Sequence, residues 1–352
     1  MMVTMKTKRR RRCGVAVTLF CTLTACTPAA PTPSPTPTTE ARYEFQPFLK
    51  AWPPSGSVQR IIWAGTKIVL AADGDVYSVQ PEAPDQPALL MSTDNAVLDL
   101  VSDEAGALIG VNTSGSITVL AADGSTVRRR TIGLAEVSGL FMDSDGTRLA
   151  EFGDSLAVTD ARSGRSVARG ELPGDEWPRY FWEAGSPTRL MGFPGHPPGR
   201  ENSIDVWTVT DNRLSVERQF CGCDPIRARF NASGSRIALA GDDGLVTLWD
   251  TARGAAVASQ RVARPAHDRV EPLAVLGDAT VLYQSSRSAA SGTTAYDDLM
   301  RWHVGTGKVD SVWGCGPRCF VSTIAVSPDG RRMVVLGGSP SGTSLWLATP
   351  VS

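Results

Sequence analysis

From residue 43 onward, apolar and polar residues alternate in short segments that are separated by tight-turn residues. The clearest stretch runs from Phe230 to Asp250, with Ser233-Gly234 and Asp243-Gly244 between its alternating segments. Alternation with a period of two is typical of strands, and such glycine pairs are typical of hairpin turns. The stretch therefore predicts three consecutive antiparallel strands.

The same plan recurs along the chain. A second clear copy starts at Ala325, contains the turn Asp329-Gly330 and ends its last strand near Trp346. Weaker copies cover residues 61–91, 97–130, 137–172, 180–219 and 270–313. The third strands of the seven copies are marked by Tyr77, Val119, Val158, Trp207, Trp249, Trp302 and Trp346. The average spacing of about 44 residues suits repeats in which each copy forms one small sheet.

The stretch Phe230–Asp250 resembles one blade of a WD-repeat β-propeller, including the Trp249-Asp250 pair that ends its third strand. The resemblance implies an all-β fold, a single β-propeller of seven four-stranded blades over residues 43–352. Six or eight blades remain alternatives, because the first, third and fourth copies are the least regular. No Gly-His pair precedes the first strand of any copy. The Asp-His-Ser-Trp network of that family is therefore not expected.

The last copy offers only three strands before the chain ends at Ser352. A sheet left in this state would expose an unpaired edge where the ring should close. The segment Tyr43–Trp52 is apolar enough to supply the missing strand. We therefore expect the ring to close by joining the two ends of the folded region.

The N-terminus has the features of an export signal. Lys6, Lys8 and Arg9 to Arg12 form a positive cluster, and Gly14–Leu23 form an apolar stretch too short to span a bilayer. The following Leu23-Thr24-Ala25-Cys26 resembles the lipobox of bacterial lipoproteins, which implies a diacylglyceryl group on Cys26. The alternative is an ordinary signal peptide that is cleaved elsewhere.

The resemblance divides the chain into a signal peptide (1–25), a lipidated cysteine with a linker (26–42) and the propeller (43–352). Residues 27–40 contain five prolines among Thr, Ala and Ser, a composition that favours extended conformers. We expect a lipid-anchored protein on the extracytoplasmic face of the cell membrane. With a net charge of −1 for the whole chain, the part after the basic signal has a net charge of −7. Nucleic acid is therefore not an expected partner.

The propeller region contains four cysteines, Cys221, Cys223, Cys315 and Cys319. Outside the membrane they should be oxidised, and four thiols permit three pairings. We favour the local bridges Cys221–Cys223 and Cys315–Cys319, because the two pairs lie in connections two blades apart. A four-thiolate metal site or a redox-active dithiol are the alternatives.

Recognisable catalytic signatures are missing from the sequence. It has three histidines, His196, His267 and His303, and no nucleophile elbow, phosphate loop or dinucleotide fingerprint in a suitable context. The run Asp143–Gly146 resembles the start of a calcium loop, but a turn explains it equally well. We therefore expect no enzyme activity, no cofactor and no metal.

Long connections predict where a partner binds, because function concentrates in loops on a rigid scaffold. The extended connections are residues 194–203, 285–297 and 337–343, all in copies four to seven. The binding-face candidates on these and neighbouring connections are His196, Arg200, Arg264, His267, Arg287, Tyr296 and Arg318. Trp177 and Trp182 fall outside the repeat and are further contact candidates, whereas the repeated tryptophans are expected in the blade cores.

The function that fits these features best is a membrane-anchored, non-catalytic module that binds a protein, or a glycan, in the cell envelope. We expect a monomer with a protein partner. One alternative is a propeller enzyme, lactonase-like or quinone-dependent, with a site over the central channel. That site would need polar residues converging from several innermost strands, and the sequence shows no repeated polar residue there. A structural role in envelope assembly is the third hypothesis.

Overall fold

A computed structural model describes the folded region of the chain. The described residues are 42–49, 58–132, 137, 139–143, 145–152, 155–171, 180–186, 189–194, 203–210, 213–220, 225–231, 233–241, 244–262, 269–288, 295–314, 320–339 and 342–351. For part of these, including most of residues 180–227, the backbone alone is described. The described residues contain strands and turns and no helix, so the all-β prediction is confirmed.

The strands form seven antiparallel sheets of four strands each. The first sheet contains β2 (Val58–Ala64), β3 (Lys67–Ala72), β4 (Asp75–Gln80) and β5 (Ala83–Ser92), and the second contains β6 (Val97–Ser102), β7 (Leu108–Thr113), β8 (Ser116–Ala121) and β9 (Thr126–Thr131). The third contains β10 (Gly139–Met142), β11 (Arg148–Phe152), β12 (Ser155–Asp160) and β13 (Ser166–Glu171), and the fourth contains β14 (Tyr180–Ser186), β15 (Arg189–Pro194), β16 (Ser203–Thr210) and β17 (Arg213–Phe220). The fifth contains β18 (Pro225–Phe230), β19 (Arg236–Gly241), β20 (Leu245–Asp250) and β21 (Ala255–Arg261), and the sixth contains β22 (Arg269–Leu276), β23 (Thr280–Ser288), β24 (Ala295–His303) and β25 (Lys308–Gly314). The seventh contains β26 (Phe320–Val326), β27 (Met333–Ser339), β28 (Gly342–Val351) and the N-terminal β1 (Arg42–Phe48).

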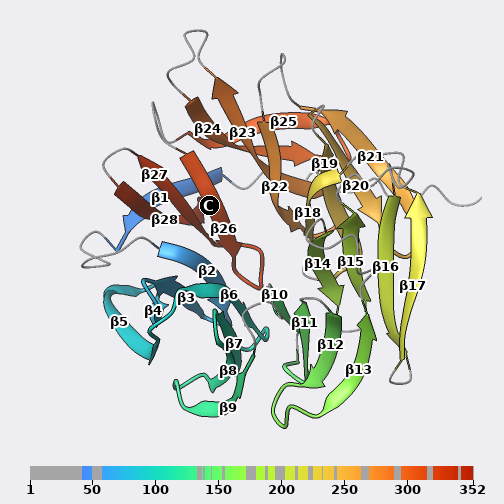
Figure 1. Cartoon of the computed structure of the whole chain (residues 1–352). Coiled ribbons are helices and arrows are strands. Elements are labelled where there is room, and N and C mark those ends of the chain that lie inside the picture. Colours follow the sequence, from blue (N-terminus) through green and yellow to red (C-terminus); the bar gives the residue numbers. More distant parts are fainter. Residues whose placement is uncertain are drawn as a thin grey trace, which may run out of the picture. The chain divides into compact units, whose positions relative to one another are not determined.

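The sheets follow one another around a ring, in the order of the sequence (Figure 1). The first strand of a sheet contacts the first strands of its neighbours, as β2 does with β6 and β26, so the first strands form the inner wall. Each sheet has four antiparallel strands and its last strand leads to the first strand of the next sheet. All first strands therefore begin at the same end of the ring, which we call the entry end.

The second strand is strongly buried in the first and second sheets. All six residues of β7 are buried, as are five of the six residues of β3. Ile109 of β7 packs in one cluster with Val69 of the first sheet, and Leu108 packs in another with Leu149 of the third. Alternate residues of one strand thus face opposite neighbours, which explains why these segments are continuously apolar.

Four of the turns between a first and a second strand have the same construction. Asp103, Asp143, Asn231 and Ser327 occupy the same position in these turns and are 2–5% exposed. Each accepts a hydrogen bond through its side-chain oxygen from a backbone N–H of the turn, for example Asp143 from Arg148 at 2.8 Å. The glycine three residues later has a φ of 68° or 69° in all four turns. A glycine is required there because other residues rarely adopt this conformation.

β1 closes the ring. It pairs antiparallel with β28 in a register that runs from Arg42 opposite Val351 to Phe48 opposite Leu345. The expectation that a segment near Tyr43 supplies the last strand is thereby confirmed; the part of that segment after Leu49 lies outside the described residues.

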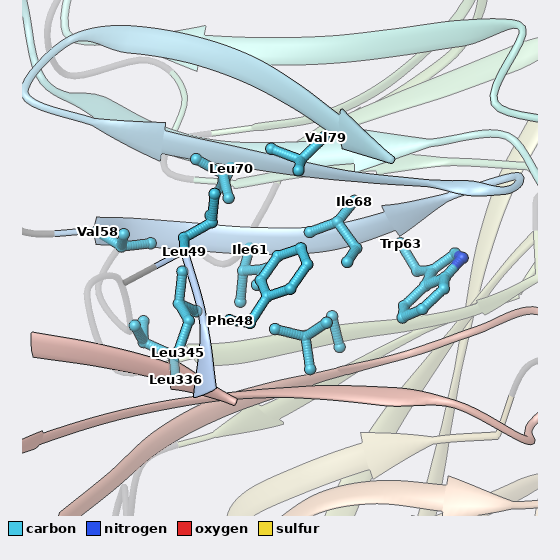
Figure 2. Packing of buried hydrophobic residues seen from close by; sticks show 12 residues of the cluster. Phe48, Leu49, Val58, Ile61, Trp63, Ile68, Leu70, Val79, Leu336 and Leu345 are labelled. Atoms are coloured by element: carbon cyan, nitrogen blue, oxygen red, sulfur yellow. The ribbon is translucent and has the colours of Figure 1, made fainter. Parts of the chain in front are cut away.

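The end of β1 is fixed by burial between the seventh and first sheets (Figure 2). Phe48 and Leu49 are 3% and 6% exposed and belong to one cluster with Val58, Leu70 and Leu345. Leu49 has a φ of 58°, a left-handed conformation that is unfavourable for a leucine. Burial of its side chain compensates for this strain. The closing strand is therefore anchored by side chains as well as by backbone pairing.

Candidate functional site

The inner wall has a recurring irregularity near the entry end. In four of the first strands one extra residue near this end forms a β-bulge, so that the pairing register shifts; the extra residues are Gln59 in β2, Leu98 in β6, Ile226 in β18 and Ser322 in β26. Two further bulges lie later in their strands, at Gly185 in β14 and Leu273 in β22. A bulge twists the strand and redirects its side chains. The bulges therefore decide which side chains face the entry end.

Three successive first strands expose a large side chain near this end. Phe320, the first residue of β26, is 50% exposed, and Leu98 of β6 is 37% exposed. Arg60 of β2, between these strands in the ring, is also exposed. Phe320 lies against Gly338, where a Cβ atom would come within 2.3 Å of the phenyl ring. We call Phe320, Arg60 and Leu98 the entry patch.

Polar side chains connect the inner strands of neighbouring sheets. Arg60 donates through Nε to the carbonyl oxygen of Leu98 at 2.8 Å, which joins the first sheet to the second. Asp99 accepts a hydrogen bond from the backbone N–H of Leu140 at 2.9 Å, which joins the second sheet to the third. These bonds satisfy backbone groups on the free edge of the first strands, which no neighbouring strand can pair.

Asp99 is an acid of the inner wall whose pKa is shifted. The residue is partly accessible to solvent, but its carboxyl group lies deep among protein atoms. Burial raises the pKa of Asp99 above its usual value, against the hydrogen bonds from Leu140 and Leu100 and the positive charges of Arg60 and Arg229. Arg229 belongs to β18, in the fifth sheet. The charges that act on Asp99 therefore come from two other sheets, the first and the fifth.

This cluster is the feature that the sequence interpretation missed. The repeats show no single polar residue in common on the inner strands, because the charged residues differ from copy to copy. The signal was their position on the first strands: Asp99 lies four residues before the buried turn residue Asp103, and Arg229 lies two residues before the buried turn residue Asn231.

Most of the predicted site residues lie outside the described residues. This holds for Cys26, for the four cysteines and for His196, Arg200, Arg264, His267 and Arg318. Arg287 and Tyr296 were expected in a loop, but their backbones lie opposite each other in the hairpin of β23 and β24. Their side chains are not described.

The extended connections are also shorter than expected in two of the three cases. The predicted loop 337–343 is wrong, because β27 continues to Ser339 and β28 resumes at Gly342, directly opposite it. The predicted loop 285–297 is too long, because residues 285–288 of β23 pair with residues 295–298 of β24. The strand continuations were missed because both segments are rich in Ser, Gly and Thr, which are common in loops.

The repeated tryptophans occupy the sheet interiors, as expected, where the structure describes them. Trp249 and Trp302 are 3% and 1% exposed. Trp346 is partly buried and lies 4.7 Å from Trp313 between ring centroids. His303 lies at the end of β24, with Nε2 3.2 Å from an Asp310 oxygen. This histidine belongs to an ion-pair cluster between strands.

The described residues contain no group of three or more His, Cys, Asp or Glu side chains placed to hold a metal ion. At the calcium-like run, Asp143 accepts from Arg148 N–H and from the Thr147 hydroxyl, and Asp145 accepts from Thr147. The turn therefore accounts for both acids. No helix in the described part of the chain is long and apolar enough to cross a membrane.

Comparisons with known proteins are informative at the level of the fold. No family model and no curated protein matches the sequence. Among solved structures, the crystal structure of the WD40 repeats of RRP9 matches with a TM-score of 0.63 at 15% identity, over 88% of this chain and 100% of that chain. The fold is therefore that of a WD40-like β-propeller. The structure of U3-55K matches this propeller equally well, with a TM-score of 0.62 at 15% identity over 87% of this chain and 98% of that chain. At this identity the likeness concerns the blades and their arrangement.

Proposed function

We propose that the chain is a lipid-anchored extracytoplasmic protein whose seven-bladed propeller binds a protein partner without catalysis. The anchor is Cys26, at the end of the lipobox-like segment, and residues 27–42 are the tether to the propeller. The observation that carries the binding role is the entry patch. It combines an exposed aromatic ring, an exposed arginine and an exposed leucine on three adjacent inner strands.

This composition suits a protein partner. Aromatic residues and arginine are enriched where proteins bind each other and supply most of the binding energy there. The three residues stand on strands whose backbones are fixed by hydrogen bonds, so little ordering cost accompanies binding. The two solved WD40-like structures support the fold on which this surface is built. They carry no information about the partner of this chain.

Photo-cross-linking in intact cells tests the proposal. A photoreactive amino acid replaces Leu98 in the entry patch or, as the matched control, Leu89 of β5, which is 57% exposed on the outer strand of the first sheet. We expect one envelope protein to be captured from position 98, not from position 89, and captured at least about five-fold less when Phe320→Ala is added. Equal capture from both positions would contradict the binding surface.

The anchor is tested separately by membrane fractionation. Wild-type protein is expected in the membrane fraction, and the Cys26→Ala variant is expected to lose its lipid and leave that fraction. If both proteins fractionate identically, the lipid-anchor proposal is wrong, whatever the cross-linking shows. A Cys13→Ala variant is the matched control, because Cys13 precedes the apolar stretch of the signal.

A further inference from the structure

The entry patch lies where three neighbouring first strands have equivalent β-bulges. Val58 of β2, Val97 of β6 and Val321 of β26 are the paired residues directly before these bulges. Arg60 and Asp99 are the first paired residues after the bulges of β2 and β6, so they occupy equivalent positions in two adjacent sheets. The wall therefore repeats its backbone here while the side chains differ.

The guanidinium of Arg60 is held by two of these bulges. It donates through Nε to the carbonyl oxygen of Leu98 at 2.8 Å and through Nη1 to the carbonyl oxygen of Gln59 at 2.9 Å. Gln59 and Leu98 are the extra residues that the pairing register leaves out. The guanidinium is thus fixed at the entry end, and it needs little further ordering to bind a partner.

The equivalent residues Arg60 and Asp99 differ in what they leave unused. Both reach the next sheet, Arg60 through Leu98 and Asp99 through the backbone N–H of Leu140 at 2.9 Å. The second oxygen of Asp99 accepts from the N–H of Leu100, so each oxygen has a backbone donor. Three of the five N–H donors of Arg60, including both on Nη2, have no acceptor among the described residues. Because Arg60 is exposed, these donors can reach a partner.

Arg60 stands between two apolar side chains along the ring. Phe320 of the seventh sheet is 50% exposed and Leu98 of the second sheet is 37% exposed. The Phe320 ring lies against the backbone of Gly338, where a Cβ atom would overlap the ring. The glycine therefore gives the ring a flat support. A partner that covers all three side chains must offer apolar contacts on both sides and a negative group in the middle.

A carboxylate is the group that fits the middle position. A guanidinium donates charge-assisted hydrogen bonds to a carboxylate, and its planar fork allows two parallel ones. A neutral side chain of the partner would leave the charge of Arg60 unpaired inside the interface, which lowers the affinity. An Asp or Glu within a chain can have apolar neighbours on both sides, whereas a C-terminal carboxylate has them on one side only.

We propose that the entry patch recognises a peptide segment of the partner in which an Asp or Glu side chain is flanked on both sides by apolar side chains. The acidic side chain binds Arg60, and its apolar neighbours pack on Phe320 and Leu98. This inference rests on the proposed function, because it specifies the chemistry of the partner that binds there.

Selection from a random library tests this preference. Seven-residue peptides displayed on phage are panned against the purified full-length protein, held by a tag after β28, which ends at the opposite end of the ring from the entry patch. We expect Asp and Glu to be enriched at least about three-fold over the unselected library at one position, with apolar residues on both sides. With Arg60→Gln the acidic preference should be lost and the apolar one kept. Arg129→Gln, on the exposed outer strand β9, is the matched control and should select as the wild type does.

A defined pair of peptides separates a binding role of Arg60 from a structural one. One selected peptide is synthesised with Glu at the acidic position and, as the control, with Gln, and fluorescence anisotropy measures both affinities. We expect the wild type to prefer Glu at least about three-fold, Arg60→Lys to keep part of this preference and Arg60→Gln to lose it. Rising salt should reduce the preference. If Arg60 only joined the two sheets, its loss would weaken both peptides equally.

Three results would overturn the inference: no enriched peptides, enriched peptides without an acidic preference, or an acidic preference that persists in an Arg60→Gln variant with the wild-type unfolding temperature. Partner capture from position 98 in cells would then still support the proposed function, and only the chemistry assigned to the partner would be wrong. Acid-selective peptides without capture in cells would instead count against the envelope partner of the proposed function.

Discussion

Two joints between neighbouring sheets are built from opposite kinds of side chain. At the joint of the sixth and seventh sheets, Phe45 of the closing strand stacks on Trp313 of β25, with ring centroids 5.4 Å apart, and Trp313 in turn contacts Trp346. At the joint of the second and third sheets, Glu151 of β11 is 2% exposed and receives Arg130 of β9 at 2.5 Å. One joint is sealed by aromatic rings and the other by a buried charge.

The difference indicates how well each joint should tolerate substitutions. Aromatic stacking is stabilised by burial of the rings and does not need hydrogen bonds of exact geometry to hold the closing strand against its neighbour. A buried carboxylate is stabilised only while its partners are present: Arg130, Arg128 at 3.8 Å and the hydroxyl of Thr159 at 3.1 Å. The aromatic joint should therefore weaken gradually on substitution, and the charged joint should fail when one group is lost.

The largest effect is expected from removing the closing strand. Deletion of residues 42–49 takes away the whole pairing of β1 with β28 and the buried side chains of Phe48 and Leu49. Loss of two such buried side chains alone should cost more than about 5 kcal/mol. We expect a lower and broader unfolding transition in urea, followed by circular dichroism. Deletion of residues 27–40 is the control and should leave the transition in place; equal behaviour of the two deletions would contradict the closure role.

The charged joint is tested by Glu151→Ala. This substitution leaves Arg128 and Arg130 without their buried counter-ion and should cost about 3 kcal/mol of unfolding free energy. Its matched control is Glu104→Ala, at an exposed turn of the second sheet, which should change stability by less than about 0.5 kcal/mol. A cost for Glu151→Ala as small as that of the control, in urea titrations at pH 7, would show that the ion pair does not hold the joint.

At the aromatic joint, the loss of stability should depend on how much of the Trp313 ring is removed. Trp313→Ala removes a partly buried ring and both of its aromatic contacts, and we expect a loss of about 2 kcal/mol. Trp313→Phe keeps a ring next to Phe45 and should cost less than about 1 kcal/mol. The same urea titrations measure both variants. If Trp313→Phe and Trp313→Ala lower the free energy of unfolding equally, stacking adds no stability at this joint beyond that due to the volume of the indole.

Sequence reasoning predicted the blades well and the inner wall poorly, and the reason is physical. The blade cores could be predicted because hydrophobic alternation and turn residues such as Asp329-Gly330 depend only on a few neighbouring residues in the sequence. The approach of Arg60, Asp99 and Arg229 depends on ring closure, which brings together residues up to 169 positions apart in the chain. The closing strand was predictable because the last copy offered only three strands and needed a fourth from elsewhere in the chain. The prediction of a loop at residues 337–343 was wrong because its small polar residues occur in both loops and strands.

The smallest effect is expected in the pH dependence of two aspartates, one that bridges two sheets and one, Asp310, that pairs with Arg301 within the sixth sheet. Burial raises the pKa of Asp99, which bridges the second and third sheets, so its contribution is fully present at low pH and is lost as the pH rises through the raised pKa. For Asp310 of β25, burial alone would raise the pKa, but the hydrogen bonds and charge of Arg301 lower it. Its contribution is present at neutral pH and is lost as the pH falls through the lowered pKa.

The two carboxylates should therefore give opposite slopes when each is replaced by its amide. Relative to wild type, Asp99→Asn should become more stable as the pH rises from 3 to 7, whereas Asp310→Asn should become less stable over the same range. Urea midpoints at four pH values measure both. Parallel slopes would mean that burial and ion pairing do not distinguish the two carboxylates, since only the opposite balance of these effects at Asp99 and Asp310 predicts slopes of opposite sign.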